Sequence, residues 1–275
     1  GITDGMHTGR RSLTVAFFSL APLQPETVYL PSAYAEIGQG VISRAGWPRE
    51  IGGASRVCVV PSQTATAVEI VTVANGSVLD RTRIDADGAP HTVSRDGCAG
   101  TESARWGDAG TRLYLSSELQ CGAGVTRSGR GVLSFTQRYE WLDVRGMRSK
   151  DASGVAVRRY LPTDDATGVP ADIRALAPAR TGATNNAILT AAAPMTIGDI
   201  AEVGTAMDSG VAATWLMERT QGVKLSINGQ QLASLADQGV PPSVIDIVVA
   251  IAHPDVFALN PASRLISQVF RHSST

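Results

Sequence analysis

Residues 196–252 read TIGDIAEVGTAMDSGVAATWLMERTQGVKLSINGQQLASLADQGVPPSVIDIVVAIA and contain a helix–turn–helix pattern written twice, offset by 32 residues (200 to 232). The recurring apolar positions are Ile200, Val203, Ala212, Trp215 and Leu216 in the first copy and Leu232, Leu235, Val244, Ile247 and Val248 in the second. We expect each copy to begin at a capping hydroxyl residue, Thr196 or Ser226, and to reverse at a glycine, Gly210 or Gly239. A helical pair of this size cannot bury its apolar stripe alone, so two copies stacked face to face are predicted.

Upstream of this repeat, the pattern is that of short strands. Turn signals such as Asn75-Gly76 and Asp87-Gly88 separate β-branched runs at 57–60, 67–73, 78–84, 91–94, 102–106, 112–119, 131–137, 140–146 and 154–161. About ten strands at hairpin spacing, without a helical period, indicate an antiparallel sheet that closes or nearly closes on itself. The predicted fold class is therefore α+β, mainly β, with an antiparallel β-barrel or sandwich-like N-terminal domain followed by a small all-α helical-hairpin domain.

Composition changes along the chain predict the domain boundaries. The β domain is expected at 1–161, a Pro/Ala/Thr-rich linker with a short helix near 172–176 at 162–194, the repeated helical-hairpin domain at 195–260 and a tail at 261–275. Residues 6–35 have some features of an export signal, but Gln24-Pro25-Glu26-Thr27 is too polar for its apolar core. A strand at 12–20 is favoured instead.

The overall composition excludes several classes of protein. An apolar content of 43% with 18% charged residues predicts a folded core, and the formal net charge of −1 provides no global field to attract nucleic acid. No apolar run is long enough to predict a transmembrane segment. The HExxH, GxSxG, Walker A and GxGxxG motifs are absent from the sequence, so no catalytic residue, metal or cofactor is predicted.

The three cysteines differ in their settings. Cys98 and Cys121 flank a predicted hairpin with its turn at 107–110; in-register partners about that turn have residue numbers that sum to 217, whereas 98 and 121 sum to 219. One bulge or a longer loop would place them opposite each other, so a Cys98–Cys121 disulfide is a geometric possibility that would imply an oxidising compartment. Cys58 lies in an apolar strand, where a thiol behaves as a small hydrophobe.

The segment from 127 to 159 is locally basic and holds Arg127, Arg130, Arg138, Arg145, Arg148, Lys150, Arg158 and Arg159. On strands of alternate facing, some of these side chains would form a ladder that could dock an acidic protein or a lipid headgroup, while a solvated outer face is the alternative. The run 127–131 is expected to be a hairpin turn, or else a nest for an anion between Arg127 and Arg130. His91 would act as a general base only if a nucleophile faced it.

Two segments resemble parts of uncharacterised exported bacterial proteins that pair a lipocalin-like antiparallel β domain with a C-terminal repeated helical-hairpin module. The first is Leu232-Ala233-Ser234-Leu235-Ala236-Asp237-Gln238-Gly239-Val240-Pro241-Pro242-Ser243-Val244-Ile245-Asp246 with His253-Pro254-Asp255-Val256-Phe257, which is similar to their helical hairpin. The second is 126–162, including Glu140-Trp141-Leu142-Asp143-Val144, which is similar to their sheet region. The resemblance implies a periplasmic or otherwise extracytoplasmic location and no substrate.

We hypothesise from these observations a non-enzymatic accessory or scaffold subunit that docks on a larger, membrane-bound complex. The periplasmic face of a photosynthetic reaction centre with its cytochrome is one candidate partner. The last predicted helix of the repeat is apolar on nearly its whole circumference. Such a helix must be buried, either in this chain or against another one. The predicted partner-binding residues are Trp215, Ile247, Ile251, Val256, Phe257, Arg127 and Arg130.

Two alternatives remain open. The first is a lipocalin-like carrier, in which the closed sheet holds a small apolar molecule. The second is a hydrolase that uses His91 without a recognisable motif.

Overall fold

The structure is a computed structural model that describes residues 17–20, 27–29, 55–61, 67–74, 76–95, 97–150, 153–162, 168–176, 189–221, 223 and 225–257. The strands are β1 (Phe17–Leu20), β2 (Thr27–Tyr29), β3 (Ser55–Pro61), β4 (Ala67–Ala74), β5 (Ser77–Asp85), β6 (His91–Arg95), β7 (Cys98–Trp106), β8 (Leu113–Cys121), β9 (Val125–Phe135), β10 (Trp141–Ser149) and β11 (Ser153–Pro162). The helices are α1 (Ala171–Leu176), α3 (Ile197–Ala206), α4 (Ser209–Arg219), α5 (Gly229–Asp237) and α6 (Pro242–Ala252). This arrangement confirms the predicted α+β, mainly β fold class. The predicted tail at 261–275 lies outside the described residues.

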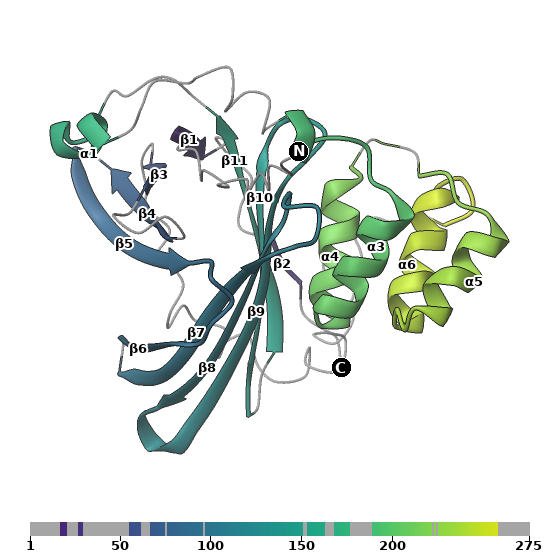
Figure 1. Cartoon of the computed structure of the whole chain (residues 1–275), viewed down its shortest axis with the longest axis horizontal. Coiled ribbons are helices and arrows are strands. Elements are labelled where there is room, and N and C mark those ends of the chain that lie inside the picture. Colours follow the sequence, from purple (N-terminus) through teal and green to yellow (C-terminus); the bar gives the residue numbers. More distant parts are fainter. Residues whose placement is uncertain are drawn as a thin grey trace, which may run out of the picture.

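The described strands form one antiparallel sheet in the order β5-β4-β3-β1-β11-β10-β9-β8-β7-β6, and β2 pairs with β11. The sheet is strongly curled (Figure 1). Its two ends meet at the turn between β5 and β6, where Asp87 forms a bridge with Arg105 of β7 and the Gly88 N–H donates to the Ala104 carbonyl at 2.8 Å. The sheet therefore has a concave inner face and a convex outer face and nearly closes on itself.

Alternation along each central strand divides its side chains between the two faces. In β10, Leu142 and Val144 are fully buried in the core beneath the helices. Trp141 belongs to a separate apolar cluster on the inner face, where Asp143 and Arg145 follow it. Because successive side chains of a strand point to opposite faces, one strand serves a helical interface and an open surface at once.

The helices α3 to α6 form a layer over the outer face of β9, β10 and β11 (Figure 1). Helix α4 lies directly on the sheet, and Trp215 is 1% exposed with its Nε1–H donating to Ser134 Oγ at 2.9 Å. A Cβ atom at Gly146 of β10 would lie 2.5 Å from Cγ2 of Val211, so glycine permits this close approach. The residues predicted to form a separate helical domain thus share one hydrophobic core with the sheet.

The repeat is visible as two stacked helical hairpins, in which α5 packs on α3 and α6 packs on α4. Thr196 caps α3 in a reciprocal box with Asp199, as predicted for the first copy. The second cap is Asn228, which forms the equivalent box with Gln231, so the prediction of Ser226 was wrong. Asn228 lies 32 residues after Thr196, and an amide oxygen at this position accepts from the same backbone donor as the threonine hydroxyl does.

The predicted reversal points had different outcomes. Gly239 has a φ of +81° and lies between α5 and α6, where a left-handed residue ends the first helix. Gly210 lies instead in the first turn of α4, because α3 already ends at Ala206 and Met207 leaves the helix with extended backbone. The prediction that Gly210 ends a helix was therefore wrong.

Two arginines of the β domain, one buried and one half-buried, bind acidic residues of the helical layer. Arg112, which follows the β7–β8 turn, lies 2.6 Å from Asp199 and 2.5 Å from Glu202 of α3. Arg159 of β11 binds Glu218 of α4 and lies 2.6 Å from Glu140. Removing one partner of such a pair leaves a poorly solvated charge, so these contacts fix where the helices sit on the sheet.

A short helix covers a second part of the outer face. Val169 lies just before α1 and Ile173 lies in it. These two residues form a cluster with Cys58, Val60, Val71 and Val73 of β3 and β4. This placement confirms the predicted helix near 172–176 and the buried, apolar setting of Cys58. Within the described ranges, none of the helices has the length and apolar character needed to cross a membrane.

Candidate functional site

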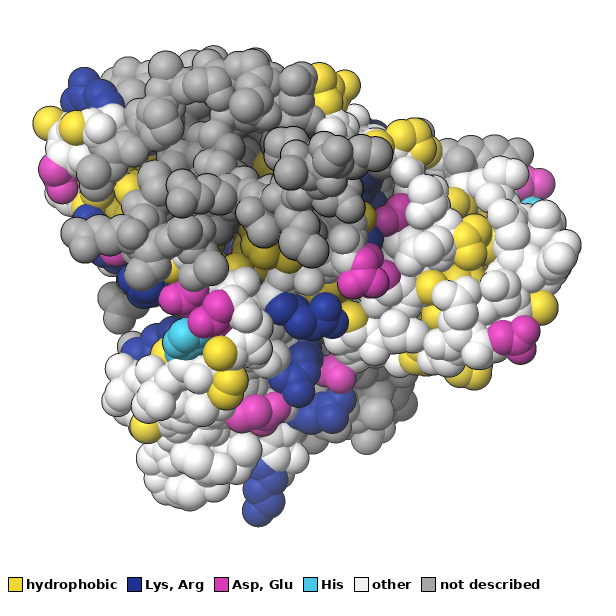
Figure 2. All heavy atoms as spheres, in the orientation of Figure 1, with side chains coloured by type: hydrophobic (Ala, Val, Ile, Leu, Met, Phe, Trp, Pro, Cys, Tyr) yellow, Lys and Arg dark blue, Asp and Glu magenta, His cyan; other side chains and the backbone are white. Residues whose placement is uncertain are grey.

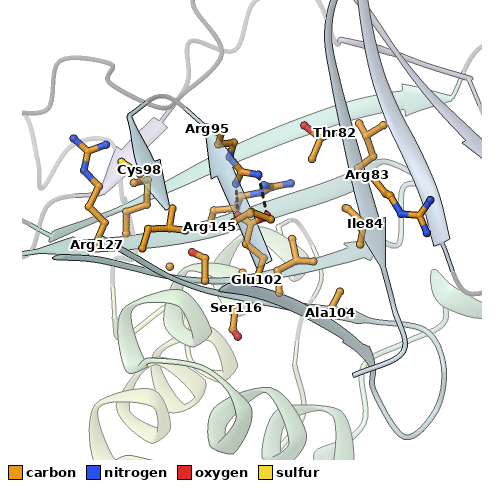
Figure 3. Close-up of a pocket in the computed structure, with 18 of the residues that line it drawn as sticks. Thr82, Arg83, Ile84, Arg95, Cys98, Glu102, Ala104, Ser116, Arg127 and Arg145 are labelled. Carbon is orange, nitrogen blue, oxygen red and sulfur yellow. Dashed lines mark hydrogen bonds and ion pairs between the residues drawn. The ribbon is translucent and has the colours of Figure 1, made fainter. Parts of the chain in front are cut away.

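The concave face of the sheet lines a half-open hollow of about 1390 Å³. Strands β3 to β11 contribute to its lining, which includes Ile84 of β5, Arg95 of β6 and Arg145 of β10 (Figure 3). A cavity of this size can accommodate a small organic molecule together with water. The hollow is the candidate site because the inner face of the sheet supplies both its apolar and its charged lining.

One end of the hollow is apolar. Trp141 and Tyr160 are paired residues of β10 and β11, and their ring centroids lie 4.9 Å apart. The buried side chains that pack with them are Val57, Ile84, Ala104, Leu113 and Leu133. An uncharged ligand segment placed here would contact aromatic and aliphatic carbon and would lose contact with water.

The other end of the hollow is rich in arginine. Arg145 follows Trp141 on the same side of β10, Arg158 lies beside Asp143 on β11, and Arg127 and Arg95 lie farther along the inner face (Figure 3). Two carboxylates, Asp143 and Glu102, lie among these four arginines. The described side chains of this end therefore carry an excess of positive charge.

Ion pairs hold part of this arginine group in place. The Nε–H of Arg145 donates to Asp143 Oδ1 at 2.8 Å, and Arg158 lies 4.0 Å from Asp143 Oδ2. Arg95 binds both oxygens of Glu102. Burial alone would lower the pKa of Arg145, but the carboxylate of Asp143 more than offsets it and raises the pKa, so Arg145 stays cationic.

Two glycines of β9 make room for polar side chains. A Cβ atom at Gly131 would lie 3.2 Å from Cγ of Arg145, and a Cβ atom at Gly129 would lie 2.5 Å from Oγ of Ser117. Arg145 therefore extends across β9 where any larger residue would displace it. Over the inner face of β9, the side chains of Arg145 from β10 and Ser117 from β8 therefore occupy the space that larger β9 side chains would fill.

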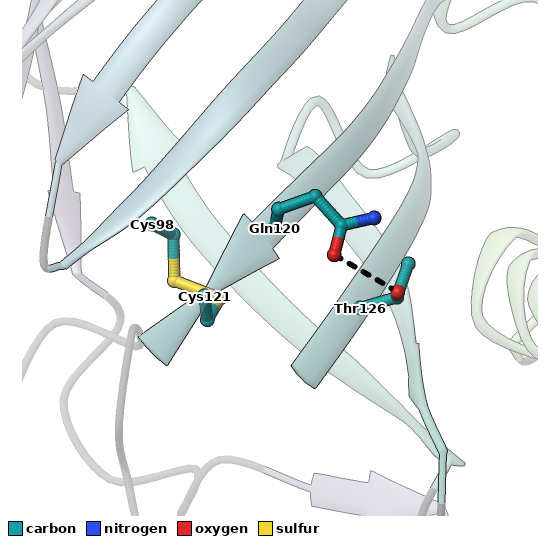
Figure 4. The surroundings of a disulfide bond; sticks show 4 residues. All are labelled: Cys98, Gln120, Cys121 and Thr126. Carbon is teal, nitrogen blue, oxygen red and sulfur yellow. Dashed lines mark hydrogen bonds between the residues drawn. A yellow bond between two sulfur atoms is a disulfide. The ribbon is translucent and has the colours of Figure 1, made fainter. Parts of the chain in front are cut away.

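A disulfide joins two neighbouring strands that line the hollow. Cys98 and Cys121 are directly opposite each other in β7 and β8 and are bonded in the structure (Figure 4). The whole β7–β8 hairpin keeps this register without a bulge, because its connection is longer than a four-residue turn and extends from Gly107 to Arg112. Of the two ways of bringing these cysteines together, the structure uses the longer loop.

The structure separates the two arginines that we grouped as partner-binding residues. The run 127–131 is part of β9 and not a hairpin turn, so the predicted turn was wrong. Arg127 points into the hollow (Figure 3), whereas Arg130 has the opposite strand parity and lies 3.4 Å from Glu118. A strand cannot present both guanidinium groups to one anion here, so the predicted nest does not form.

The apolar residues of the predicted partner surface are also divided. Trp215 and Ile251 are corrected from surface to core residues, because the sheet covers Trp215 and the helical core covers Ile251, which is 8% exposed. Ile247 is partly buried against the same core. Val256 and Phe257 follow α6 and are 69% and 46% exposed, so they are the apolar members of the predicted surface that solvent reaches.

His91 begins β6 at the rim of the hollow. Its Nε2 atom lies 2.9 Å from Asp87 Oδ1, and its side chain is 43% exposed. A partner carboxylate is thus present, but the geometry does not place His91 in a water-shielded cleft.

The sequence reading missed Trp141, Tyr160, Arg145 and Arg158 as members of one site. The usable signal was the alternation of Trp141, Asp143 and Arg145 in β10. This alternation predicts which residues share a face, but it assigns that face to the hollow only when the face covered by the helices is known.

The comparisons with known proteins identify no family. No protein-family model matches the chain, and no curated protein matches it. Among solved structures, a secretary abundant heat soluble (SAHS) protein from Ramazzottius varieornatus matches with 8% sequence identity and a TM-score of 0.31, covering 52% of this chain and 92% of that chain. We draw nothing from so weak a likeness, and the resemblance to exported bacterial proteins stays a prediction.

Proposed function

We propose that this chain is a binding protein for a small amphipathic anion, with the apolar part of the ligand beside Trp141 and Tyr160 and its acidic group among the arginines. The observation that carries the proposal is the polarity gradient within one hollow, from the aromatic pair to Arg145 and Arg127. A long-chain carboxylate has the matching gradient. The proposal sharpens the carrier alternative of the sequence analysis.

The energetics favour a ligand with both parts. Each buried methylene group contributes about 0.8 kcal/mol, so a chain of several carbons provides most of the affinity. A hydrogen bond to a charged group contributes about 1.5–3 kcal/mol, and a planar guanidinium matches a carboxylate in shape. The arginines therefore select the head group and the aromatic end retains the chain.

Three ligands of equal chain length test this proposal: dodecanoate, dodecanol and dodecyltrimethylammonium. Isothermal titration calorimetry at submicellar concentrations should give affinities in the order carboxylate, alcohol, ammonium, because only the head group differs. Equal affinity for the carboxylate and the ammonium would show that the arginines do not discriminate between head groups by charge. Failure of all three to bind would refute the proposed function.

A matched pair of variants locates the head group. Arg127→Gln should weaken dodecanoate binding about tenfold, which corresponds to about 1.4 kcal/mol, and leave dodecanol binding unchanged. Arg148→Gln changes an exposed arginine of β10 that faces away from Arg145 and is not part of the lining of the hollow, and it should change neither. An equal loss in both variants would place the carboxylate outside the hollow.

The accessory-subunit hypothesis stays a prediction, as do its extracytoplasmic location and its partner. Its main argument was the apolar circumference of α6. The structure already buries Val244, Val248 and Ile251 of this helix within the chain, so α6 needs no second protein to cover these positions.

A further inference from the structure

The turn between β5 and β6 brings together three side chains of the types that bind metal ions. Asp85 ends β5, Asp87 lies in the turn and His91 begins β6. One ligand atom from each residue lies within 4.8 Å of the other two. Figure 2 shows a histidine beside acidic side chains on the exposed surface at this edge.

The backbone of this turn is held from several sides. Asp87 forms the bridge to Arg105, and the Gly88 N–H binds the Ala104 carbonyl. Asp87 Oδ1 also accepts the N–H of Ala89 at 2.8 Å, and Gly88 has a φ of +83°, which favours glycine. The three side chains therefore project from a fixed turn and not from a long loop.

The donor set favours some cations over others. Carboxylates alone suit calcium or magnesium, whereas an added imidazole suits zinc and similar transition metals. Ligand atoms around tetrahedral zinc lie about 3.4 Å apart, given metal–ligand distances of about 2.1 Å, so a small closing movement of these side chains suffices.

One neighbouring charge competes for this site. The Arg83 guanidinium lies 3.1 Å from Asp85 Oδ2, and its side chain is 49% exposed. The Asp85 side chain is 16% exposed, so a cation that displaces Arg83 must itself neutralise a largely buried carboxylate, which a divalent ion bound by Asp85 does.

We propose that Asp85, Asp87 and His91 form a binding site for a zinc-type divalent cation. The site lies where the two ends of the curled sheet meet, and Asp85 and His91 also line the hollow. A bound cation ties the end of β5 to the start of β6 and thereby holds the seam of the sheet closed. This inference concerns the rim of the hollow and does not depend on the ligand proposed above.

Zinc titration into protein purified without a histidine tag and treated with a chelator tests the site. Calorimetry should show one zinc ion per chain, and thermal melting should shift upward when zinc is present. His91→Ala should weaken zinc binding at least about tenfold, as should Asp87→Asn, because each removes a ligand. His253→Ala, at the C-terminal end of α6, is the matched control and should bind zinc as the unmodified chain does.

Three results would overturn the proposal. They are the absence of zinc binding at millimolar concentration, His91→Ala binding that equals the unmodified chain, and binding that depends on His253. Circular dichroism of both ligand variants confirms that they are folded, and their exposed positions make global unfolding a small risk. Calcium chloride serves as a second probe and should bind much more weakly than zinc, whereas tighter calcium binding would contradict the assigned donor set.

Discussion

The outer and inner faces of strands β8 to β11 are made by alternate residues of the same segments, yet they differ in almost every property. The outer face is covered by α4, packs Val144 in one core with Trp215 of that helix, and is joined to α3 through Arg112 beside β8. The inner face is open and carries Trp141 with a group of arginines. The difference teaches that the position of the covering helices determines whether an arginine of these strands pairs with a helix or lines the hollow.

The largest expected contrast is between the tryptophans of the two faces. Trp215→Ala should reduce the free energy of unfolding by about 3–5 kcal/mol, because it opens a cavity under α4 and leaves Ser134 without its donor. Trp141 is also buried, at 6% exposed, but it borders the hollow, where water can fill the space that it leaves, so Trp141→Ala should cost less stability and should also weaken binding of the proposed apolar ligand chain. Denaturant unfolding followed by circular dichroism measures the first effect and calorimetry the second, and a larger stability loss in Trp141→Ala would invert the comparison.

Alanine at two glycines gives a smaller contrast. Gly146→Ala places a methyl group 2.5 Å from Val211 across the helix interface and should cost about 1–3 kcal/mol. Gly131→Ala meets Cγ of Arg145 and the Val144 carbonyl oxygen, both at 3.2 Å, and should cost about 1 kcal/mol, less than Gly146→Ala because neither contact is as short. The two chemical changes are identical, so equal losses in urea unfolding would mean that both faces are equally rigid.

The smallest expected effect is a pH dependence of the free energy of unfolding that arises at the contact between the sheet and helix α3. Burial alone would raise the pKa of Asp199, but hydrogen bonds from Thr196 and the charge of Arg112 outweigh it and lower the pKa below its usual value of 3.8. The ionised carboxylate therefore adds stability above pH 3.8 that is lost as the pH falls through the lowered pKa. Asp199→Asn should flatten this part of the stability profile, while Asp246→Asn on α6 should retain it; identical profiles for Asp199→Asn and the unmodified chain would contradict the assignment.

Much of the fold could be predicted because local signals mark it. Strand runs separated by turn residues, and helices that begin at capping residues, depend on nearby residues alone. The misplaced cap at Ser226 shows the limit of one signal, since Asn228 with Gln231 repeats the Thr196 and Asp199 box and the offset of the repeat would have identified it.

The candidate site could be predicted only in part, because it depends on long-range closure. The excess of arginine between 127 and 159 was visible, but assigning Arg127 inward and Arg130 outward requires the strand register and the position of α4. Trp215 was misplaced for the same reason, since an apolar helix stripe does not specify whether its own sheet or another protein will cover it.

The stacking of two helical hairpins has a kinetic consequence. Helices α5 and α6 lie beyond α3 and α4 from the sheet (Figure 1), so their release would uncover part of the first hairpin while every strand pair stays intact. Amide hydrogens of the outer hairpin should therefore exchange through a partial opening well before those of α4 or β10. Partial opening of the outer hairpin would therefore leave the strands that line the hollow in place.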